Sequence, residues 1–222
     1  MRKIIVATFL SMDGVMQAPG GPQEDTSNGF KWGGWIVHYG DDLTNNAVGK
    51  IMSKPFDLLL GRRTYEIFAA HWPYQNDAIG EIFNRINKYV VATTPIDTSW
   101  KNSILINKDV VNELKKLKKQ DGPDLLVHGS SKLVQTLFAH QLIDELHTWI
   151  YPITLGKGKK LFEEGTQAQE WKLTDSVVST TGVIIASYVP GGDVKTGSFV
   201  PDQPSAAEMK RREKWRKEEN KK

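Results

Sequence analysis

The chain has 222 residues with ordinary apolar and charged fractions, which is enough to bury a substantial core. The absence of cysteine excludes disulfides, thiolate catalysis and cysteine-bound metals. The apolar runs are too short to span a membrane and the N-terminus is soon polar, which favours a cytoplasmic protein without a membrane partner. The net charge of +3 arises in residues 205–222, which carry +4, whereas residues 1–204 carry −1, so a nucleic-acid partner is not favoured.

Residues 3–10 are apolar and rich in β-branched side chains, which predicts a buried strand. A long loop containing many Gly and Pro residues follows, from Ser11 to about residue 40. Its rings Trp32, Trp35 and Tyr39 favour burial or a ligand, so we expect a lid or binding loop. The pattern after this loop predicts a helix over 42–53.

The segment from Leu58 to Glu66 is the most informative of the chain, because a buried strand over 57–60 runs directly into a helix over 62–69. Backbone N–H groups at a helix N-terminus favour an anion, and the guanidinium groups of Arg62 and Arg63 can bind a phosphate bidentately. Together with Gly61 and Thr64, this junction predicts a phosphorylated ligand.

Strand and helix patterns alternate through the rest of the chain, over 78–86 (helix), 88–93 (strand), 103–106 (strand), 109–119 (helix), 124–128 (strand) and 145–153 (strand). Between the last two strands, Gly129-Ser130-Ser131 opens a further helix with Leu133, Leu137 and Phe138 on its inner side. Two final strands, 170–178 and 183–190, are joined by a hairpin turn at Thr181-Gly182. This order predicts an α/β fold with a mostly parallel central sheet flanked by helices and an antiparallel C-terminal hairpin. We expect one domain over 1–190 and a charged tail over 191–222, partly helical or flexible.

Two further strand ends carry similar chemistry, at Thr93-Thr94 and at Gly129-Ser130-Ser131. Ligands of open α/β sheets bind beyond the carboxyl ends of the strands, so three such ends together predict a nucleotide site. Each has a simpler alternative: solvated arginines, a plain strand end and an ordinary helix cap. Neither G-x-G-x-x-G nor a P-loop motif occurs, and the five histidines lack metal-ligand spacing, so we expect no metal.

The order and spacing of several motifs resemble the dihydrofolate reductase superfamily, in particular the branch of the C-terminal reductase domain of bifunctional riboflavin-biosynthesis enzymes. The resemblance covers about residues 1–190 and rests on these segments: Ser11-Met12-Asp13-Gly14, Leu59 to Glu66, Tyr89 to Thr94, Val127 to Leu133, Asp144-Glu145-Leu146 and Pro152 to Gly158.

The resemblance implies an NADPH-dependent reductase with a dihydrofolate reductase-like fold. It implies that the adenosine side of the cofactor and its 2′-phosphate are held by Gly61, Arg62, Arg63, Thr64, Thr93 and Thr94. The pyrophosphate side would be held by Gly129, Ser130, Ser131 and Leu133. The nicotinamide would be bordered by Ala7, Gly14, Val15 and Met16. Asp42, on the helix facing the substrate, would help to protonate or orient a C=N bond, unless it or Asp41 is only a helix cap.

The implied substrate is a small pterin-like or pyrimidine-like heterocycle, such as dihydrofolate or 5-amino-6-(5-phosphoribosylamino)uracil, and the implied assembly is a homodimer. Thr64 to Phe68 stands where riboflavin-pathway reductases carry a T-V-x-x-D-D-P-x-L stretch, and no cysteine-containing deaminase domain is present, which weakens the riboflavin substrate. A nucleotide-binding module without turnover, used for protein contacts, is the alternative function.

Overall fold

The computed structural model describes residues 1–199 and 203–220, which form two compact units, Met1–Gly192 and Asp193–Lys222. The predicted tail over 191–222 begins at nearly the same place, although its residues 200–202 and 221–222 lie outside the described part. Within the tail, Ala206–Glu219 forms helix α6, whose N-cap Ser205 accepts a hydrogen bond from the Glu208 N–H.

The larger unit alternates strands and helices, and its regular elements are β1 (Ile4–Ser11), α1 (Asp42–Met52), β2 (Phe56–Gly61), α2 (Arg62–Ala69), α3 (Ala78–Arg85), β3 (Lys88–Val91), β4 (Ser103–Ile106), α4 (Val110–Lys119), β5 (Asp124–Val127), α5 (Ser131–Ala139), β6 (Glu145–Tyr151), β7 (Glu170–Val178) and β8 (Ile184–Gly192). Short 3-10 turns lie at Ser27–Gly29, Val37–Tyr39 and Trp72–Tyr74. The predicted element order is confirmed, with ends differing by one or two residues.

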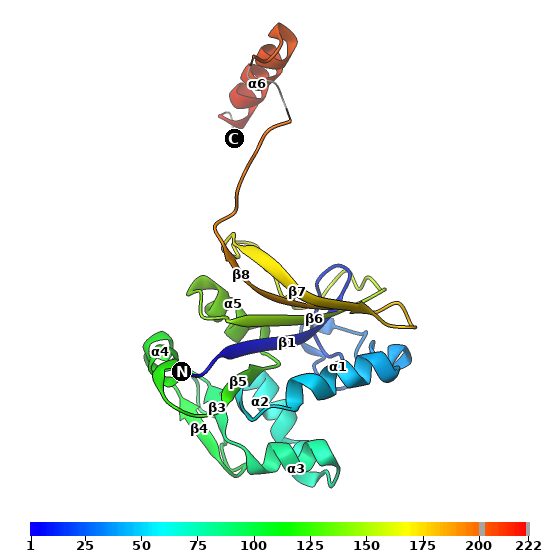
Figure 1. Cartoon of the computed structure of the whole chain (residues 1–222), viewed down its shortest axis with the longest axis vertical. Helices are drawn as coiled ribbons and strands as arrows, with labels where there is room; N and C mark the ends of the chain where they lie inside the picture. Colours follow the sequence, from blue (N-terminus) through cyan, green and yellow to red (C-terminus); the bar gives the residue numbers. More distant parts are fainter. Residues whose placement is uncertain (200–202, 221–222) are drawn as a thin grey trace. The chain divides into compact units, whose positions relative to one another are not determined.

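In the described part of the chain, one eight-stranded sheet has the order β4-β3-β2-β5-β1-β6-β8-β7 (Figure 1). Neighbouring strands from β4 to β6 are parallel, whereas β8 runs antiparallel to both β6 and β7. The predicted fold class is therefore confirmed. Since β1, β2 and β5 are adjacent and parallel, their carboxyl ends meet at one edge of the sheet, where α/β proteins bind ligands.

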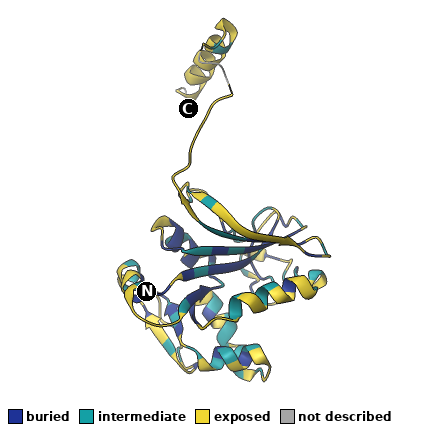
Figure 2. Cartoon of the chain, in the orientation of Figure 1, coloured by how far each residue is buried: buried dark blue, intermediate teal, exposed yellow. Residues whose placement is uncertain are grey.

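Two apolar layers enclose the sheet. On one face α4 and α5 bury leucines such as Leu114 and Leu137 against β1 and β5, and on the other α1, α2 and α3 pack over Leu58, Leu60 and Leu126. Strand alternation separates the two layers, because successive side chains of one strand point to opposite faces. The central strands are buried, whereas the edge strand β7 is largely exposed (Figure 2).

Local sequence features explain where the helices near the site begin. Asp41 caps α1 through a capping box with Thr44, so of the two predicted capping candidates it is Asp41 that fills the role. Asp41 also accepts two hydrogen bonds from Thr180, which fixes the start of α1 to the hairpin turn. Strand β2 runs into α2 without a loop residue, as its sequence predicts.

Candidate functional site

A cavity of about 700 Å³ opens where β1, β2 and β5 end, on the sheet face that α1 and α2 cover. Its apolar wall comes from β1, α1, α2 and α3 and includes Phe9, Met52, Phe68 and Phe83. Its polar wall comes from the loop over 17–25, from the start of α2, and from the segment between β5 and α5. The volume lies within the range of small-molecule and cofactor sites.

Six of the predicted site residues line this cavity, and they come from four separate segments of the chain: Ala7, Met16, Arg63, Thr64, Ser130 and Ser131. The N-termini of α2 and α5 both face this region, since Arg63 and Thr64 lie in the first turn of α2 and Ser131 opens α5. Free backbone N–H groups at two helix starts and a guanidinium group give the polar wall an anion-binding character.

Two glycines allow the segments of this wall to lie in contact. A Cβ on Gly61 would come within 2.2 Å of the Ser130 Oγ and 2.9 Å of the Ser130 nitrogen, and a Cβ on Gly129 would lie 2.7 Å from the Thr64 Oγ1. The Gly61 N–H donates to the Gly129 carbonyl at 3.0 Å, and the peptide bond between Gly129 and Ser130 is cis. The two predicted phosphate segments are thus packed directly on each other.

Arg62 and Thr94, predicted from separate strand ends, meet on the surface beside this wall. The Arg62 Nη1 donates to the Thr94 Oγ1 at 2.7 Å, and its Nε donates to Glu66 at 2.9 Å. Thr93 lies next to Thr94 and is exposed. This arrangement presents one guanidinium group and two hydroxyl groups to solvent at the edge of the sheet.

The turn after β1 is fixed by Asp13, whose carboxylate accepts hydrogen bonds from the N–H groups of Leu155 and Gly156 and from the Ser11 hydroxyl. Burial opposes the charge, but these three hydrogen bonds together lower the Asp13 pKa to about 2. Gly14 adopts a φ of +81°, and the following Val15 is buried and bridges to Lys160. The predicted residues Gly14 and Val15 therefore shape the turn that delivers Met16 to the cavity.

A buried polar network that the sequence did not predict holds the loop over the cavity. Asp25 is 7 % exposed, and its carboxylate contacts the Lys159 Nζ at 2.5 Å and the Arg63 Nη1 at 3.4 Å. Burial raises the pKa of Asp25, but hydrogen bonds from Lys159 and Ser27 outweigh it, so the net pKa is lowered. Charged residues far apart in sequence carry no local pattern, and only the fold pairs them.

Gln17 is the second centre of this network and is almost fully buried. Its amide nitrogen donates to the Asp25 carbonyl, its amide oxygen accepts from the Lys159 N–H at 3.0 Å, and its own carbonyl accepts from the indole of Trp35 at 2.8 Å. The expected burial of Trp35 is confirmed, and Tyr39 is half-buried, whereas Trp32 is 60 % exposed. The long loop is thus an ordered wall of the cavity.

His128 lines the cavity just after β5, and its Nδ1 lies 3.1 Å from the Ala7 carbonyl oxygen. A carbonyl oxygen can only accept, so this contact requires a proton on Nδ1, and in the neutral ring the lone pair is then on Nε2. Burial lowers the pKa of His128 to about 4, although the bond to Ala7 acts in the opposite direction. His128 is therefore neutral near pH 7.

Nine of the fifteen predicted site residues do not line the cavity, and Asp42 and Leu133 are two of them. Asp42 is exposed on the first turn of α1 and is not among the described residues that line the cavity. Leu133 is buried in the core between α5 and the opposite face of the sheet. A 3.6-residue period identifies Leu133 as a buried position but cannot tell which neighbour it contacts.

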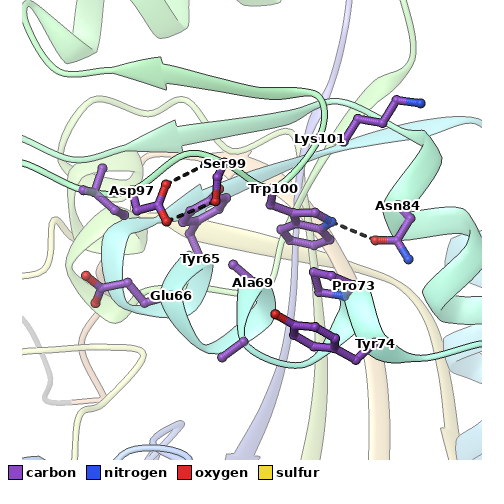
Figure 3. Close-up of a pocket in the computed structure, with 12 residues that line it drawn as sticks. Tyr65, Glu66, Ala69, Pro73, Tyr74, Asn84, Asp97, Ser99, Trp100 and Lys101 are labelled. Carbon is purple, nitrogen blue, oxygen red and sulfur yellow. Dashed lines mark hydrogen bonds between the residues drawn. The ribbon is translucent and has the colours of Figure 1, made fainter.

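A second cavity of about 650 Å³ lies beside α2, and none of the predicted site residues lines it. Figure 3 shows its aromatic wall, where the Trp100 Nε1 donates to the Asn84 Oδ1 at 2.8 Å and Tyr65 lies on the other side of the indole. Glu66, which also lines this cavity, is the partner of Arg62. The second cavity therefore borders α2 at Tyr65 and Glu66.

In residues 1–199 and 203–220 no group of three or more His, Asp or Glu side chains is placed to hold a metal ion. No described helix has both the length and the apolar character needed to cross a membrane.

Comparison with known proteins shows the family to which the chain belongs. Residues 2–185 match the RibD C-terminal domain family. The uncharacterized protein YyaP of Bacillus subtilis (strain 168) is 24% identical over 192 residues, which cover 84% of this chain and 94% of YyaP.

Two solved structures share the fold. A protein from Shewanella sp. PV-4 assigned to riboflavin biosynthesis has a TM-score of 0.61 at 18% identity, covering 86% of this chain and 99% of that protein. Dihydrofolate reductase from Enterococcus faecalis, solved in complex with NADP(H) and RAB-propyl, has a TM-score of 0.54 at 15% identity, covering 85% of this chain and 96% of the reductase. The chain belongs to the RibD C-terminal domain family and has the dihydrofolate reductase-like fold of that reductase-type family.

Proposed function

We propose that this protein is an NADPH-dependent reductase that delivers hydride to a small heterocycle, pterin-like or pyrimidine-like. The single observation that carries the proposal is the cavity at the carboxyl ends of β1, β2 and β5, where two helix N-termini and Arg63 form a polar wall opposite an apolar one. A nicotinamide dinucleotide needs this combination, because its phosphates are anionic and its reactive ring is apolar.

The residues present fit the adenosine side of NADPH. Arg62, Thr93 and Thr94 lie together at the sheet edge and offer a guanidinium group and two hydroxyls to a 2′-phosphate. Ser130, Ser131 and the start of α5 would hold the pyrophosphate, because they line the cavity beside the start of α2. Gly61 and Gly129 allow the two helix starts to pack this close to each other.

The nicotinamide side of the site would lie against Ala7 and Met16, which line the cavity near the end of β1. When bound, the cofactor supplies the hydride. The chain's own contribution is to orient the ring against the apolar wall, to exclude water with the loop over 17–25, and to provide a proton to the substrate. We also propose, from the family resemblance, that the protein acts as a cytoplasmic homodimer.

The test is a titration of the purified chain with NADPH and with NADH, read by cofactor fluorescence. We expect saturable binding that prefers NADPH, and Arg62→Ala should weaken NADPH binding about 10- to 100-fold, the range for one charge-assisted hydrogen-bond partner. Binding of NADH should change little, because NADH lacks the 2′-phosphate. Arg85→Ala, at an exposed arginine in the last turn of α3, is the matched control.

Absence of binding by either cofactor would refute the proposal and make Arg62, Arg63 and the threonines structural. Equal loss of NADPH and NADH affinity in Arg62→Ala would refute the assignment of the 2′-phosphate to Arg62. The predicted catalytic role of Asp42 remains a prediction: Asp42→Ala with lost turnover and retained NADPH binding would support it, and unchanged turnover would refute it.

The alternative function is a nucleotide-binding module without turnover. The observation that favours it is the exposed position of Asp42 outside the cavity, which leaves the predicted proton source away from the nicotinamide. Tight NADPH binding with no hydride transfer to dihydrofolate, aminouracil or dye acceptors would select this alternative.

A further inference from the structure

Reduction of a C=N bond requires a proton as well as a hydride, and the described cavity contains six ionisable side chains that could be its source: Glu24, Asp25, Arg63, His71, His128 and Lys159. The argument rests on the proposed reductase function, because a module without turnover needs no proton donor. Position and hydrogen bonding separate the six.

Four of the six are unsuitable donors. Arg63 does not release its proton in proteins. Asp25 is held as a carboxylate by Lys159, and loss of the Lys159 proton would leave that buried carboxylate without its ammonium partner. His128 carries its proton on Nδ1, where the Ala7 carbonyl binds it, so its other nitrogen has no proton to give.

Glu24 differs from these in both position and partners. It lies half-buried in the loop that covers the cavity and lines the cavity itself. Its Oε2 accepts hydrogen bonds from the backbone N–H groups of Gly20 at 2.6 Å and Gly21 at 3.2 Å. Its Oε1 has no hydrogen-bond partner in residues 1–199 and 203–220, so the carboxyl group is held in place by one oxygen while the other stays available.

We propose that Glu24 is the catalytic acid of this site and protonates the nitrogen of a C=N bond in a small heterocyclic substrate. In the balanced step, the substrate carbon gains a hydride from the reduced nicotinamide and its nitrogen gains the proton from the Glu24 carboxyl. The C=N double bond becomes a C–N single bond, the nicotinamide leaves oxidised, and the Glu24 carboxylate regains a proton from solvent.

The electrostatic surroundings support this role. Burial is the largest influence on Glu24 and raises its pKa above the ordinary value, against the two backbone hydrogen bonds, and the neighbouring Asp25 carboxylate raises it further. The cations that face the pair, Lys159 and Arg63, contact Asp25. A carboxyl group with a raised pKa keeps its proton closer to neutral pH, which is what a general acid needs.

The first experiment measures the protonation of Glu24 directly by NMR on the full chain with ¹³C-labelled glutamate side chains. The Glu24 carboxyl resonance is assigned by its disappearance in Glu24→Gln. We expect its titration midpoint to lie above the ordinary glutamate value of about 4.3. A midpoint at or below that value would overturn the proposal, because the group would then be a carboxylate throughout the working range.

The second experiment follows single-turnover NADPH oxidation across a range of pH, with dihydrofolate as the probe acceptor because it carries a reducible C=N bond. Glu24→Gln should lower the rate about 100-fold and remove the decline that wild type shows as pH rises, while NADPH affinity stays within twofold of wild type. Glu24→Asp, which keeps an acid, should recover part of the rate. His71→Gln tests the sixth group, which is exposed at the cavity rim.

The outcomes separate this proposal from the proposed function. No NADPH binding by wild type refutes the reductase function itself. NADPH binding without NADPH oxidation selects the module without turnover and overturns the acid role of Glu24 together with the reductase function. An unchanged pH profile in Glu24→Gln overturns the acid role alone. Loss of the pH dependence in His71→Gln instead of Glu24→Gln would assign the acid to His71.

Discussion

The contact between Gly61 and Ser130 gives a direct test of how the polar wall of the cavity is built. In Gly61→Ala the new methyl group would lie 2.2 Å from the Ser130 Oγ and 2.9 Å from the Ser130 backbone nitrogen. The hydroxyl can rotate away, but the backbone nitrogen cannot, so the segment between β5 and α5 has to move away from the end of β2. The substitution therefore separates the two helix N-termini that form the polar wall.

Overpacking of this kind costs about 1–3 kcal/mol of unfolding free energy. We expect Gly61→Ala to lower the urea midpoint accordingly and to weaken NADPH binding about 10-fold or more, since about 1.4 kcal/mol of lost binding free energy is a factor of ten. Urea denaturation followed by tryptophan fluorescence measures the first effect, and cofactor titration measures the second. The double variant Gly61→Ala/Ser130→Gly should recover only the part due to the hydroxyl.

Gly49→Ala is the matched control, because no atom lies within 4 Å of its added Cβ and the position is inside α1. Replacing a helical glycine by alanine should stabilise the protein by up to about 1 kcal/mol and leave NADPH binding unchanged. If Gly61→Ala has the same urea midpoint and the same NADPH affinity as wild type, the two segments are not in the close contact that the structure shows. The account of the polar wall would then be wrong.

Three further predictions concern charged and titratable groups that the fold holds in place. Asp57→Ala should cost about 3–5 kcal/mol in urea denaturation, because it leaves the Arg2 guanidinium buried without its carboxylate; a loss under 1 kcal/mol would contradict this. Asp13→Ala should cost about 1–3 kcal/mol by leaving the N–H groups of Leu155 and Gly156 unpaired, and unchanged stability would mean that water replaces the carboxylate. His128 has a pKa of about 4 when folded and 6.5 when unfolded, so its contribution to stability is complete above pH 6.5 and is lost as pH falls toward 4, at most about 3 kcal/mol. Between pH 6.5 and 4, the free energy of unfolding of His128→Gln should therefore depend less on pH than that of wild type, and equal pH dependence would refute the neutral state of His128.

The element order and the fold class were predictable because each element carries its own local pattern. The apolar run at 57–60 followed by a polar helix start identifies β2 and α2, and Thr181-Gly182 identifies the final hairpin. Short-range periodicity depends only on which residues follow one another, so it survives without tertiary information. The place of the strand-end residues was predictable for another reason: parallel strands bring their carboxyl ends together. The cavity is accordingly lined by Arg63, Thr64, Ser130 and Ser131.

Contacts between distant segments could not be predicted in this way. Asp25 and Lys159 are 134 positions apart, and His128 meets the Ala7 carbonyl across two neighbouring strands. Residue type and position also did not indicate that Asp42 is exposed and that Leu133 is buried in the core, because exposure depends on how the elements pack.

The sequence by itself determined the alternation of strands and helices, the strand ends whose residue types suit phosphate binding, and the absence of thiol chemistry, because these depend on residue type and spacing alone. Only the tertiary structure decided which polar groups enter the cavity and in which protonation state. Burial and partners set the pKa of Glu24, Asp25 and His128, and both are properties of the packed chain.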